Sequence, residues 1–324
     1  MKYAFIVNPA SGNGKGATRV REELKAYETD NLRIYCTEGE QDATVLADSI
    51  AAAAEKEGET VNVFACGGDG TIQEIAKGLL NHPNARLGIV PVGSGNDYVR
   101  CFNHPEHFMN MELQLKAGER EECLRKVDVL EYTWREGEQK MTDYAINGIN
   151  IGFDGNTAIL AHDLKELPLV HGTGSYLLAV LVNLVKKKGT DLQVFADGKE
   201  IHNGPLMLAT AANGRFCGGG VESCPHALLD NGKIELLLVR NITRRYLMRV
   251  FPAFKAGRLE TISGVEKYII PMRAEEVILK PNQGRMKYVA DGEIRETGEI
   301  KVRVLPGALT VIEPWEVRNL GIER

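Results

Sequence analysis

The sequence lacks the marks of secreted, membrane-spanning and nucleic-acid-binding proteins. Its six cysteines include no CxxC pair, and scattered cysteines in a chain of this size are typical of reduced thiols in a cytoplasm. The longest apolar stretch, from Tyr176, is too short to cross a bilayer, and the apolar run at the N-terminus is too short for a signal peptide. A net charge of −5 disfavours a general nucleic-acid binder, although it leaves room for a local basic patch. We therefore expect a cytoplasmic protein with no nucleic-acid partner.

Two kinds of pattern divide the 324 residues. Residues 1–125 alternate short apolar runs with helical patterns over residues 15–27, 42–56 and 71–80, which predicts a parallel sheet wrapped by helices. Residues 126–324 contain mainly strands and turns, including a hairpin turn at Asp197-Gly198, with helical insertions near residues 175–187 and 244–256. The chain is thus expected to be an α/β domain followed by a mostly β domain.

Three polar or glycine-rich loops follow predicted parallel strands, at residues 8–12, 67–71 and 92–97. Ligands bind at the carboxyl edge of open α/β sheets, so these loops can converge on one site. Glycine lets a phosphate approach the backbone, whereas Asp69 would repel a phosphate unless a metal ion lay between them. The first loop is not a Walker loop, since Gly16 replaces its Ser or Thr and Pro9 replaces its first glycine. No strand leads into the GxGxxG of a dinucleotide-binding fold.

Four motifs follow one another along the chain: "NPASGNGKG", "GGDGTIQEI", "PVGSGNDYVR" and, far downstream, "ADGE". Together they resemble the motifs of the soluble diacylglycerol kinase family, which also includes sphingosine and ceramide kinases. The resemblance covers nearly the whole chain. It implies an NAD kinase-like α/β domain, a C-terminal β-sandwich, a nucleotide cleft between them, and a last segment that returns to the first domain. It also implies transfer of the γ-phosphoryl group of ATP to a lipid hydroxyl, with diacylglycerol or a related lipid as acceptor and Mg²⁺ as cofactor.

The resemblance assigns roles to individual residues. Asp69 and Asp97 would hold the catalytic Mg²⁺; from the residues alone, Asp97 also fits a helix N-cap, and both roles can hold at once. Glu74, expected in the first turn of its helix, would contact nucleotide or favour the helix start. The residues implied to bind ATP are Asn8, Pro9, Ala10, Ser11, Gly12, Thr37, Gly67, Gly68, Asp69, Gly70, Thr71, Glu74, Ser94 and Asn96.

The downstream acidic pair supplies the implied base. Glu293 would accept the proton of the lipid hydroxyl, with Asp291 beside it at the site. Without the resemblance, "VADGEIRE" predicts only a β-turn.

A second, structural Mg²⁺ is implied at the turn "HALLDNGKI", through Leu228, Asn231 and Lys233. Family members have an aspartate where this chain has Asn231. A neutral amide is a weaker ligand for a hard cation, so the sequence leaves this metal open.

Two other functions stay open: an NAD kinase, which shares the GGDG loop, and a non-catalytic nucleotide-sensing protein on the same fold. A zinc site at Cys101, His104 and His107 is disfavoured because the segment lacks a nearby fourth ligand and contains Pro105.

A lipid kinase without a membrane span must meet its substrate by transient, peripheral contact with a membrane. Basic residues suited to that contact are Lys165, Lys186, Lys187 and Lys188. The sequence does not identify the lipid, and it leaves a homodimer open.

Overall fold

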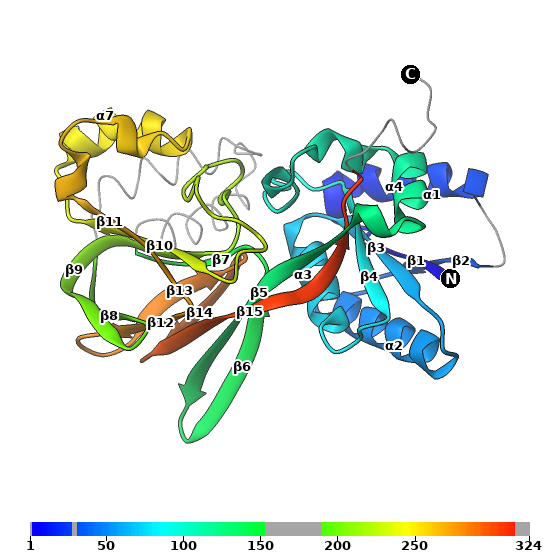
Figure 1. Ribbon diagram of the computed structural model, residues 1–324, viewed down its shortest axis with the longest axis horizontal. Coiled ribbons are helices and arrows are strands. Elements are labelled where there is room, and N and C mark those ends of the chain that lie inside the picture. Colours follow the sequence, from blue (N-terminus) through cyan, green and yellow to red (C-terminus); the bar gives the residue numbers. More distant parts are fainter. Residues whose placement is uncertain (1, 28–30, 153–188, 315–324) are drawn as a thin grey trace. The chain divides into compact units, whose positions relative to one another are not determined.

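The computed structural model describes residues 2–27, 31–152 and 189–314. It divides into two compact units, of which the first contains residues 1–127 and the segment after residue 306, and the second contains residues 128–306. Strands β5 (Leu124–Glu136) and β15 (Ile300–Ile312) each run from one unit into the other (Figure 1). The helix expected near residues 175–187 lies outside the described residues.

The first unit is built on a parallel sheet. Its strands are β1 (Lys2–Val7), β2 (Leu32–Cys36), β3 (Val61–Gly67) and β4 (Ala85–Pro91), in the order β2-β1-β3-β4. The end of β15 runs parallel beside β4. Every residue of β3 is buried, as expected for a strand with a neighbour on each side and helices over its faces. Phe5 and Phe64 stack across β1 and β3 with ring centroids 4.5 Å apart. The predicted α/β domain is confirmed.

Helices pack against this sheet. They are α1 (Lys15–Leu24), α2 (Asp42–Lys56), α3 (Asp69–Leu79) and α4 (Met111–Gly118), with short 3-10 helices at Ser11–Gly14, Lys25–Tyr27, Val99–Cys101, Pro105–Met109 and Glu121–Cys123. The helix α2 has the predicted bounds. It packs closely on α3, because a Cβ at Gly78 would lie 2.4 Å from the carbonyl oxygen of Thr44.

The start of α3 differs from the prediction. Gly68 is extended and caps the helix, so α3 begins at Asp69 rather than at residue 71. Glu74 therefore lies beyond the first turn, and the expectation that it stands at the helix start is wrong.

The second unit is antiparallel. Besides β5 and β15 it contains β6 (Gln139–Ala145), β7 (Gly148–Gly152), β8 (Thr190–Ala196), β9 (Lys199–Ala212), β10 (Ile234–Arg240), β11 (Ile269–Ala274), β12 (Glu276–Pro281), β13 (Met286–Ala290) and β14 (Glu293–Thr297). The strand order is β14-β13-β7-β9-β8-β12-β15, while β10 pairs with β9 and β11, and β5 with β6. A continuous apolar core from these strands confirms the predicted β-sandwich.

The helix α7 (Arg244–Lys255) covers part of this unit (Figure 1). The side chain of Thr243 caps its start by accepting from the backbone N–H of Tyr246 at 3.3 Å. Leu247 and Val250 are buried in a second apolar core against β9 and β10. The predicted helical insertion at residues 244–256 is confirmed, and 3-10 helices follow at Leu259–Thr261 and Val265–Lys267.

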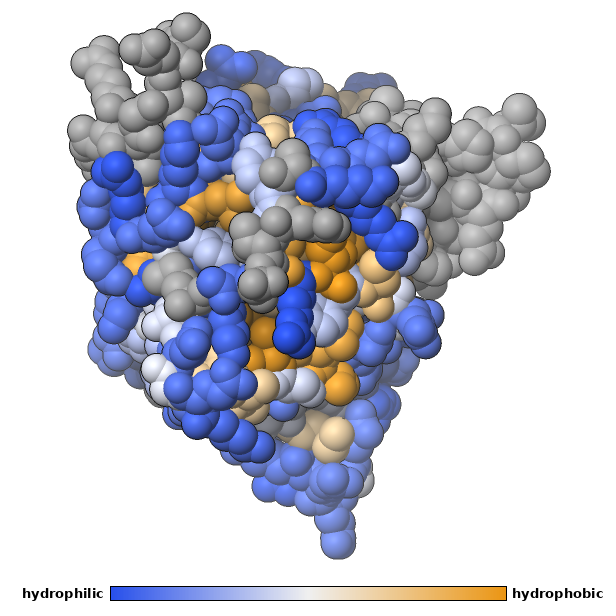
Figure 2. All heavy atoms as spheres, turned by 90° about the vertical axis from the view of Figure 1, so that its right-hand side faces the viewer, coloured by the Kyte–Doolittle hydropathy of each residue, from blue (hydrophilic) through white to orange (hydrophobic). Residues whose placement is uncertain are grey.

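The surface is mixed in character. Figure 2 shows hydrophilic residues over most of one face of the molecule, with apolar residues gathered in its middle. No helix within the described ranges combines the length and the apolarity that crossing a bilayer requires. Large apolar side chains that are exposed in the described structure are Val45, Met109, Leu228, Met248 and Ile294.

Candidate functional site

The three loops of the first unit meet at one edge of its sheet. Asn8, directly after β1, donates from its side-chain amide to the Thr71 hydroxyl at 3.0 Å, and its side-chain oxygen accepts from the N–H of Ala10 at 3.0 Å. Thr37, at the end of β2, donates its backbone N–H to Val7 at 3.0 Å. The side chain of Asn8 thus joins the first loop to the start of α3.

Glycines allow the loops to approach one another. A Cβ at Gly93 would lie 2.5 Å from the Cα of Gly68, and a Cβ at Gly12 would lie 2.6 Å from the carbonyl oxygen of Val92. Gly12 also has a φ of 61°, which disfavours any other residue. The convergence of the three loops agrees with the sequence analysis.

The N-terminus of α3 points its backbone donors into this group of loops. The N–H groups of Asp69, Gly70 and Thr71 stand in the first turn, where a helix offers no carbonyl partner. No side chain at Gly68 occupies the cap. Such a helix start, with its positive partial charge and close-lying glycines, suits an anionic group such as a phosphate. Gly70 and Ser94 are exposed beside it.

Asp69, the first residue of α3, lies beside the loop that carries Asp97. The carboxylate of Asp69 accepts from the backbone N–H of Tyr98 at 3.1 Å, so it is attached to the residue that follows Asp97. Asp97 is only 6% exposed, and its carboxylate lies 3.9 Å from the guanidinium of Arg100. The 3-10 helix beyond it starts at Val99, and the residue at its N-cap is Tyr98 rather than Asp97.

These residues fit a hard cation and a polar ligand. The carboxylates of Asp69 and Asp97 are oxygen donors of the kind that Mg²⁺ takes alongside nucleotide phosphates and water. In the third loop Asn96, with a φ of 52°, donates to the Gly93 carbonyl at 3.0 Å. Its buried side-chain oxygen has no hydrogen-bond partner among the described residues. A buried acceptor of this kind is costly unless a bound donor satisfies it.

The Asp-Gly-Glu segment forms a tight hairpin in the second unit. Asp291 and Gly292 have φ values of 45° and 95°, as a two-residue turn of type I′ requires, and Ala290 pairs with Glu293. The Asp291 carboxylate accepts backbone N–H groups of Ile146 at 2.6 Å, Asn147 at 3.1 Å and Gly148 at 2.7 Å. Asp291 therefore fixes the turn against the start of β7.

Glu293 is held by an arginine on its own strand. One terminal nitrogen of the Arg295 guanidinium donates to Glu293 at 2.8 Å and to Asp143 at 2.7 Å. The guanidinium carbon lies 4.9 Å from the centroid of the Trp134 ring, a cation–π distance. This contact restricts the rotation of Arg295, so its hydrogen bond orients the Glu293 carboxylate.

Two buried tyrosines line the same region. Tyr132 donates its hydroxyl to Asp143 at 3.1 Å, and its ring packs edge-on against Tyr288. Burial raises the pKa of both hydroxyls well above the ordinary value. Both tyrosines therefore stay neutral at physiological pH and do not compete with Glu293 as bases.

A buried polar cluster beside this region was missed by the sequence analysis. Asp128 is 2% exposed, and its backbone carbonyl accepts from the Asn213 side chain at 2.9 Å. Asn213 also donates to the Ile146 carbonyl at 2.8 Å, next to the amides that Asp291 binds. A lone aspartate inside the apolar run "KVDVLEY" is the sequence signal that could have identified it.

The turn proposed for a structural metal is closed by hydrogen bonds. The side-chain oxygen of Asn231 accepts the N–H of Lys233 at 3.0 Å, and the Asp128 carboxylate accepts the N–H of Gly232 at 2.6 Å. Of the three implied ligands, Leu228 and Lys233 can offer main-chain carbonyls, and Asn231 offers a neutral amide oxygen that already accepts one N–H. A structural Mg²⁺ at this turn stays a prediction, with a weaker ligand at Asn231 than a carboxylate.

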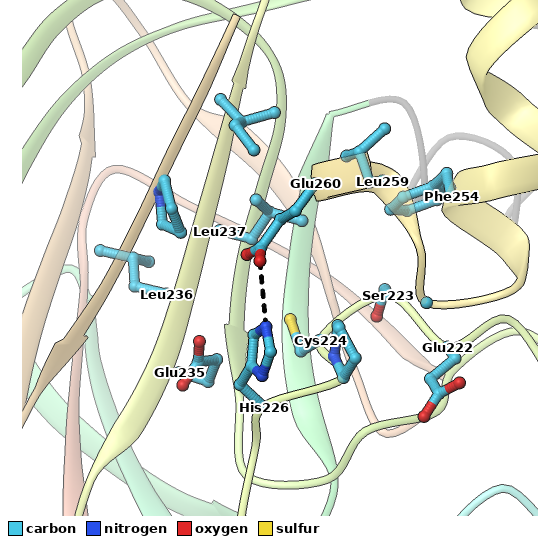
Figure 3. Close-up of a pocket in the computed structure, with 14 residues that line it drawn as sticks. Glu222, Ser223, Cys224, His226, Glu235, Leu236, Leu237, Phe254, Leu259 and Glu260 are labelled. Carbon is cyan, nitrogen blue, oxygen red and sulfur yellow. Dashed lines mark hydrogen bonds and ion pairs between the residues drawn. The ribbon is translucent and has the colours of Figure 1, made fainter. Parts of the chain in front are cut away.

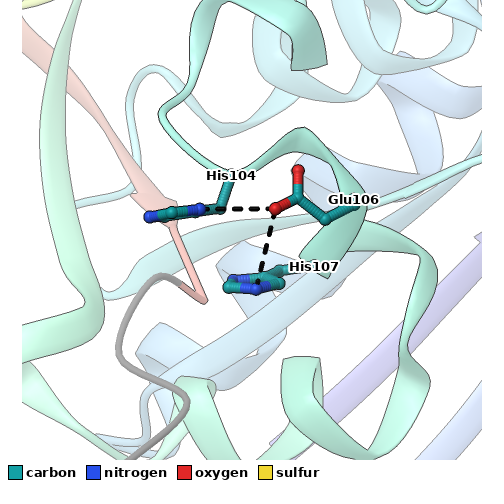
Figure 4. Close-up of side chains that lie close together, drawn as sticks. All are labelled: His104, Glu106 and His107. Carbon is teal, nitrogen blue, oxygen red and sulfur yellow. Dashed lines mark hydrogen bonds and ion pairs between the residues drawn. The ribbon is translucent and has the colours of Figure 1, made fainter.

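The His104 loop brings three polar side chains together (Figure 4). Ligand atoms of His104, Glu106 and His107 lie within 4.8 Å of one another. One ring nitrogen of His107 already bonds the Pro314 carbonyl at 2.7 Å. Cys101 instead donates to the Asp97 carbonyl at 3.5 Å, and the described residues supply no fourth ligand to the group. A zinc site at this loop therefore remains disfavoured.

Among the described residues, the second unit contains a pocket of about 390 Å³, part of it open to solvent, in which His226 pairs with Glu260 at 3.1 Å (Figure 3). Glu235 in its wall pairs with Arg273 at 2.8 Å. Another pocket, of about 460 Å³ with part of that space open to solvent, lies beneath α7 and has an entirely apolar or aromatic lining. Its walls include Met207, Val239, Tyr246, Phe251 and Tyr268.

Comparisons with known proteins agree with this architecture. Residues 2–132 match the family model described as the diacylglycerol kinase catalytic domain, and residues 147–313 match the YegS C-terminal NAD kinase beta sandwich-like domain. A parallel-sheet unit whose loops suit a phosphate, followed by a β-sandwich, is the architecture that these two family models describe together. The chain belongs to the family that joins a diacylglycerol kinase catalytic domain to a YegS-type C-terminal domain.

Individual relatives match over nearly their full length. A diacylglycerol kinase of Mycobacterium tuberculosis is 26% identical over 324 residues, which cover 97% of this chain and 95% of the relative. A diacylglycerol kinase of Bacillus subtilis is 29% identical over 307 residues, 90% of each chain. The crystal structure of a diacylglycerol kinase from Bacillus anthracis str. Sterne aligns over 96% of both chains with a TM-score of 0.64 and 20% identity, which supports the fold.

Proposed function

We propose that this protein is an ATP-dependent lipid kinase that transfers the γ-phosphoryl group to a lipid hydroxyl, with diacylglycerol as the first candidate acceptor. The observation that carries the proposal is the group of three loops around the exposed start of α3, with Asp69 at that start and Asp97 in the loop beside it. Family membership favours a lipid acceptor, and the names of the relatives point to diacylglycerol.

The first unit would bind the nucleotide. Backbone donors at the start of α3 would contact the phosphates, while Asn8 and Thr71 keep the first two loops in register. Asp69 and Asp97 would hold Mg²⁺, which would offset the charge that develops on the transferred phosphoryl group. The unsatisfied side-chain oxygen of Asn96 would accept a hydrogen bond from the nucleotide.

The second unit would bind the acceptor. We assign the general base to Glu293, oriented by Arg295, because proton transfer from a hydroxyl needs a carboxylate held in place. Asp291 acts on the turn that carries Glu293, since its carboxylate is engaged by three backbone N–H groups. The pocket beneath α7 would take an acyl chain, because its lining consists of apolar and aromatic side chains.

A direct assay separates this proposal from an NAD kinase. Purified protein is incubated with γ-labelled ATP and Mg²⁺, with either NAD or mixed micelles of diacylglycerol as the acceptor. We expect label in the lipid and none in the nucleotide. Label in NAD would contradict the proposal.

The variant Asp69→Asn tests whether the protein is catalytic at all. We expect it to lose lipid phosphorylation by at least about 100-fold while its thermal unfolding stays close to that of the wild type, because only the metal-binding charge is removed. A wild type that binds ATP but phosphorylates no acceptor would instead support a nucleotide-sensing protein.

A further inference from the structure

A strongly basic stretch surrounds α7, although the whole chain carries a net charge of −5. Residues 240–258 contain no Asp or Glu. The basic side chains of this stretch are all exposed, and they are Arg240, Arg244, Arg245, Arg249, Lys255 and Arg258. The local charge therefore has the opposite sign to that of the protein.

The helix itself is amphipathic. Leu247 and Val250 are buried on its inner face. Its outer face follows helical spacing through residues 244, 245, 248, 249, 252 and 255, all of them exposed. Met248 lies among these basic residues with 57% of its surface exposed. A helix with arginines and an exposed apolar side chain on one face is typical of helices that lie on a lipid bilayer.

Five of these six basic side chains have no acidic partner among the residues that the structure describes. Within the described ranges, no carboxylate lies within 4 Å of Arg240, Arg245, Arg249, Lys255 or Arg258. Other basic residues of the second unit differ, because Arg303 pairs with Glu131 at 2.6 Å and Lys233 with Glu275 at 2.6 Å. The field around α7 is therefore free to attract an anionic surface.

We propose that the outer face of α7 docks this protein on a bilayer that contains anionic lipids. The arginines would lie at the phosphate groups, and Met248 would enter the interface between them. The same helix forms a wall of the apolar pocket through Tyr246 and Phe251, so docking would bring that pocket to the lipid. The inference that docking delivers a lipid substrate rests on the proposed lipid kinase function. Binding to vesicles can be measured without any turnover.

The test is co-sedimentation of the full chain with vesicles of phosphatidylcholine, alone or mixed with phosphatidylglycerol. We expect binding only to the anionic vesicles, and weaker binding as salt is added. The double variant Arg245→Gln/Arg249→Gln should bind about 25-fold more weakly, because each basic residue near an anionic surface contributes about fivefold in affinity. Arg245→Lys/Arg249→Lys should bind like the wild type.

A matched control is Lys140→Gln/Lys199→Gln, which removes the same charge from two exposed hairpin positions of the second unit. We expect it to retain vesicle binding. Equal weakening by both double variants, unchanged binding by the α7 variant, or equal binding to neutral vesicles would each overturn the proposal. Thermal unfolding of each variant confirms that it is folded.

Activity on a water-soluble short-chain diacylglycerol separates this proposal from the proposed function. The α7 variant should retain that activity, because neither Arg245 nor Arg249 lines the pocket. A protein that binds anionic vesicles but phosphorylates no lipid would leave the docking surface intact and contradict the kinase assignment alone.

Discussion

The second unit contains the tripeptide Ala-Asp-Gly twice, at residues 196–198 and 290–292, and the two copies have different surroundings. Both close two-residue hairpins, with φ values of 48° and 77° in the first and 45° and 95° in the second. Asp197 uses one carboxylate oxygen, which accepts the N–H groups of Glu275 at 2.9 Å and Glu276 at 3.0 Å. Asp291 uses both of its oxygens on three N–H groups.

The residue after each glycine marks the larger difference. The first turn continues into Lys199, which is exposed, and the second into Glu293, which is held by Arg295. The tripeptide therefore specifies a hairpin, while the contacts around it decide whether a carboxylate is oriented for chemistry. Matched variants of the two turns test this difference.

The largest effect is expected at the position after the glycine. Glu293→Gln removes the proposed base and should lower kcat by about 100- to 10,000-fold. Lys199→Gln changes the same position of the other turn and should leave kcat within about twofold. Initial rates of lipid phosphorylation measure both, and a similar rate in the two variants would remove the distinction between the turns.

The aspartates should differ in their contribution to stability. Asp291→Asn turns an amide donor toward backbone N–H groups, so we expect a loss of about 2–3 kcal/mol in the free energy of unfolding. Asp197→Asn keeps one acceptor oxygen for its two donors and should cost less than about 1 kcal/mol. Urea unfolding of both variants gives the comparison. Equal losses would show that the second turn has no special support.

Arg295 has no counterpart in the first hairpin, where Ile201 holds the corresponding position. Arg295→Met should lower kcat about tenfold with little change in KM for ATP, since it frees the carboxylate that acts as base. Arg295→Lys should recover part of the rate. The control is Arg303→Met, which removes a different arginine–glutamate pair. A change in KM alone would assign Arg295 to nucleotide binding instead.

The smallest effect, on thermal unfolding, is expected at a third turn of the second unit. At residues 228–233 the side chains of Asp128 and Asn231 accept the backbone N–H groups of Gly232 and Lys233, and we expect these bonds to hold the turn without a metal. The wild type should unfold at the same temperature with Mg²⁺ or with a chelator in the absence of nucleotide. Asn231→Asp restores the carboxylate and should gain a few degrees from Mg²⁺. A chelator-sensitive wild type would show that the turn holds a metal after all.

Local chemistry explains what the sequence predicts well. The bounds of α2 follow from its alanine face, and the Asp197-Gly198 hairpin follows from its turn residues. The three loops follow from apolar strands that give way to polar or glycine-rich segments. The start of α3 was misplaced because Gly68 can either end a strand or begin a helix, and only the packed structure decides that.

Long-range contacts explain what the sequence does not predict. Asp291 binds the N–H of Ile146, which is 145 residues away, and Arg295 reaches Asp143 across 152 residues. No periodicity or turn preference encodes such pairs. Asp128 is a similar case, because its carboxylate accepts the N–H of Gly232, which is 104 residues away.

The most direct test of the whole account is the transfer of labelled γ-phosphate from ATP to diacylglycerol in mixed micelles, measured for the wild type beside Glu293→Gln. We predict labelled phosphatidic acid from the wild type and at least about a 100-fold lower rate from the variant, with both proteins equally folded. Equal labelling by the two proteins, or no labelled lipid from a folded wild type, would contradict it.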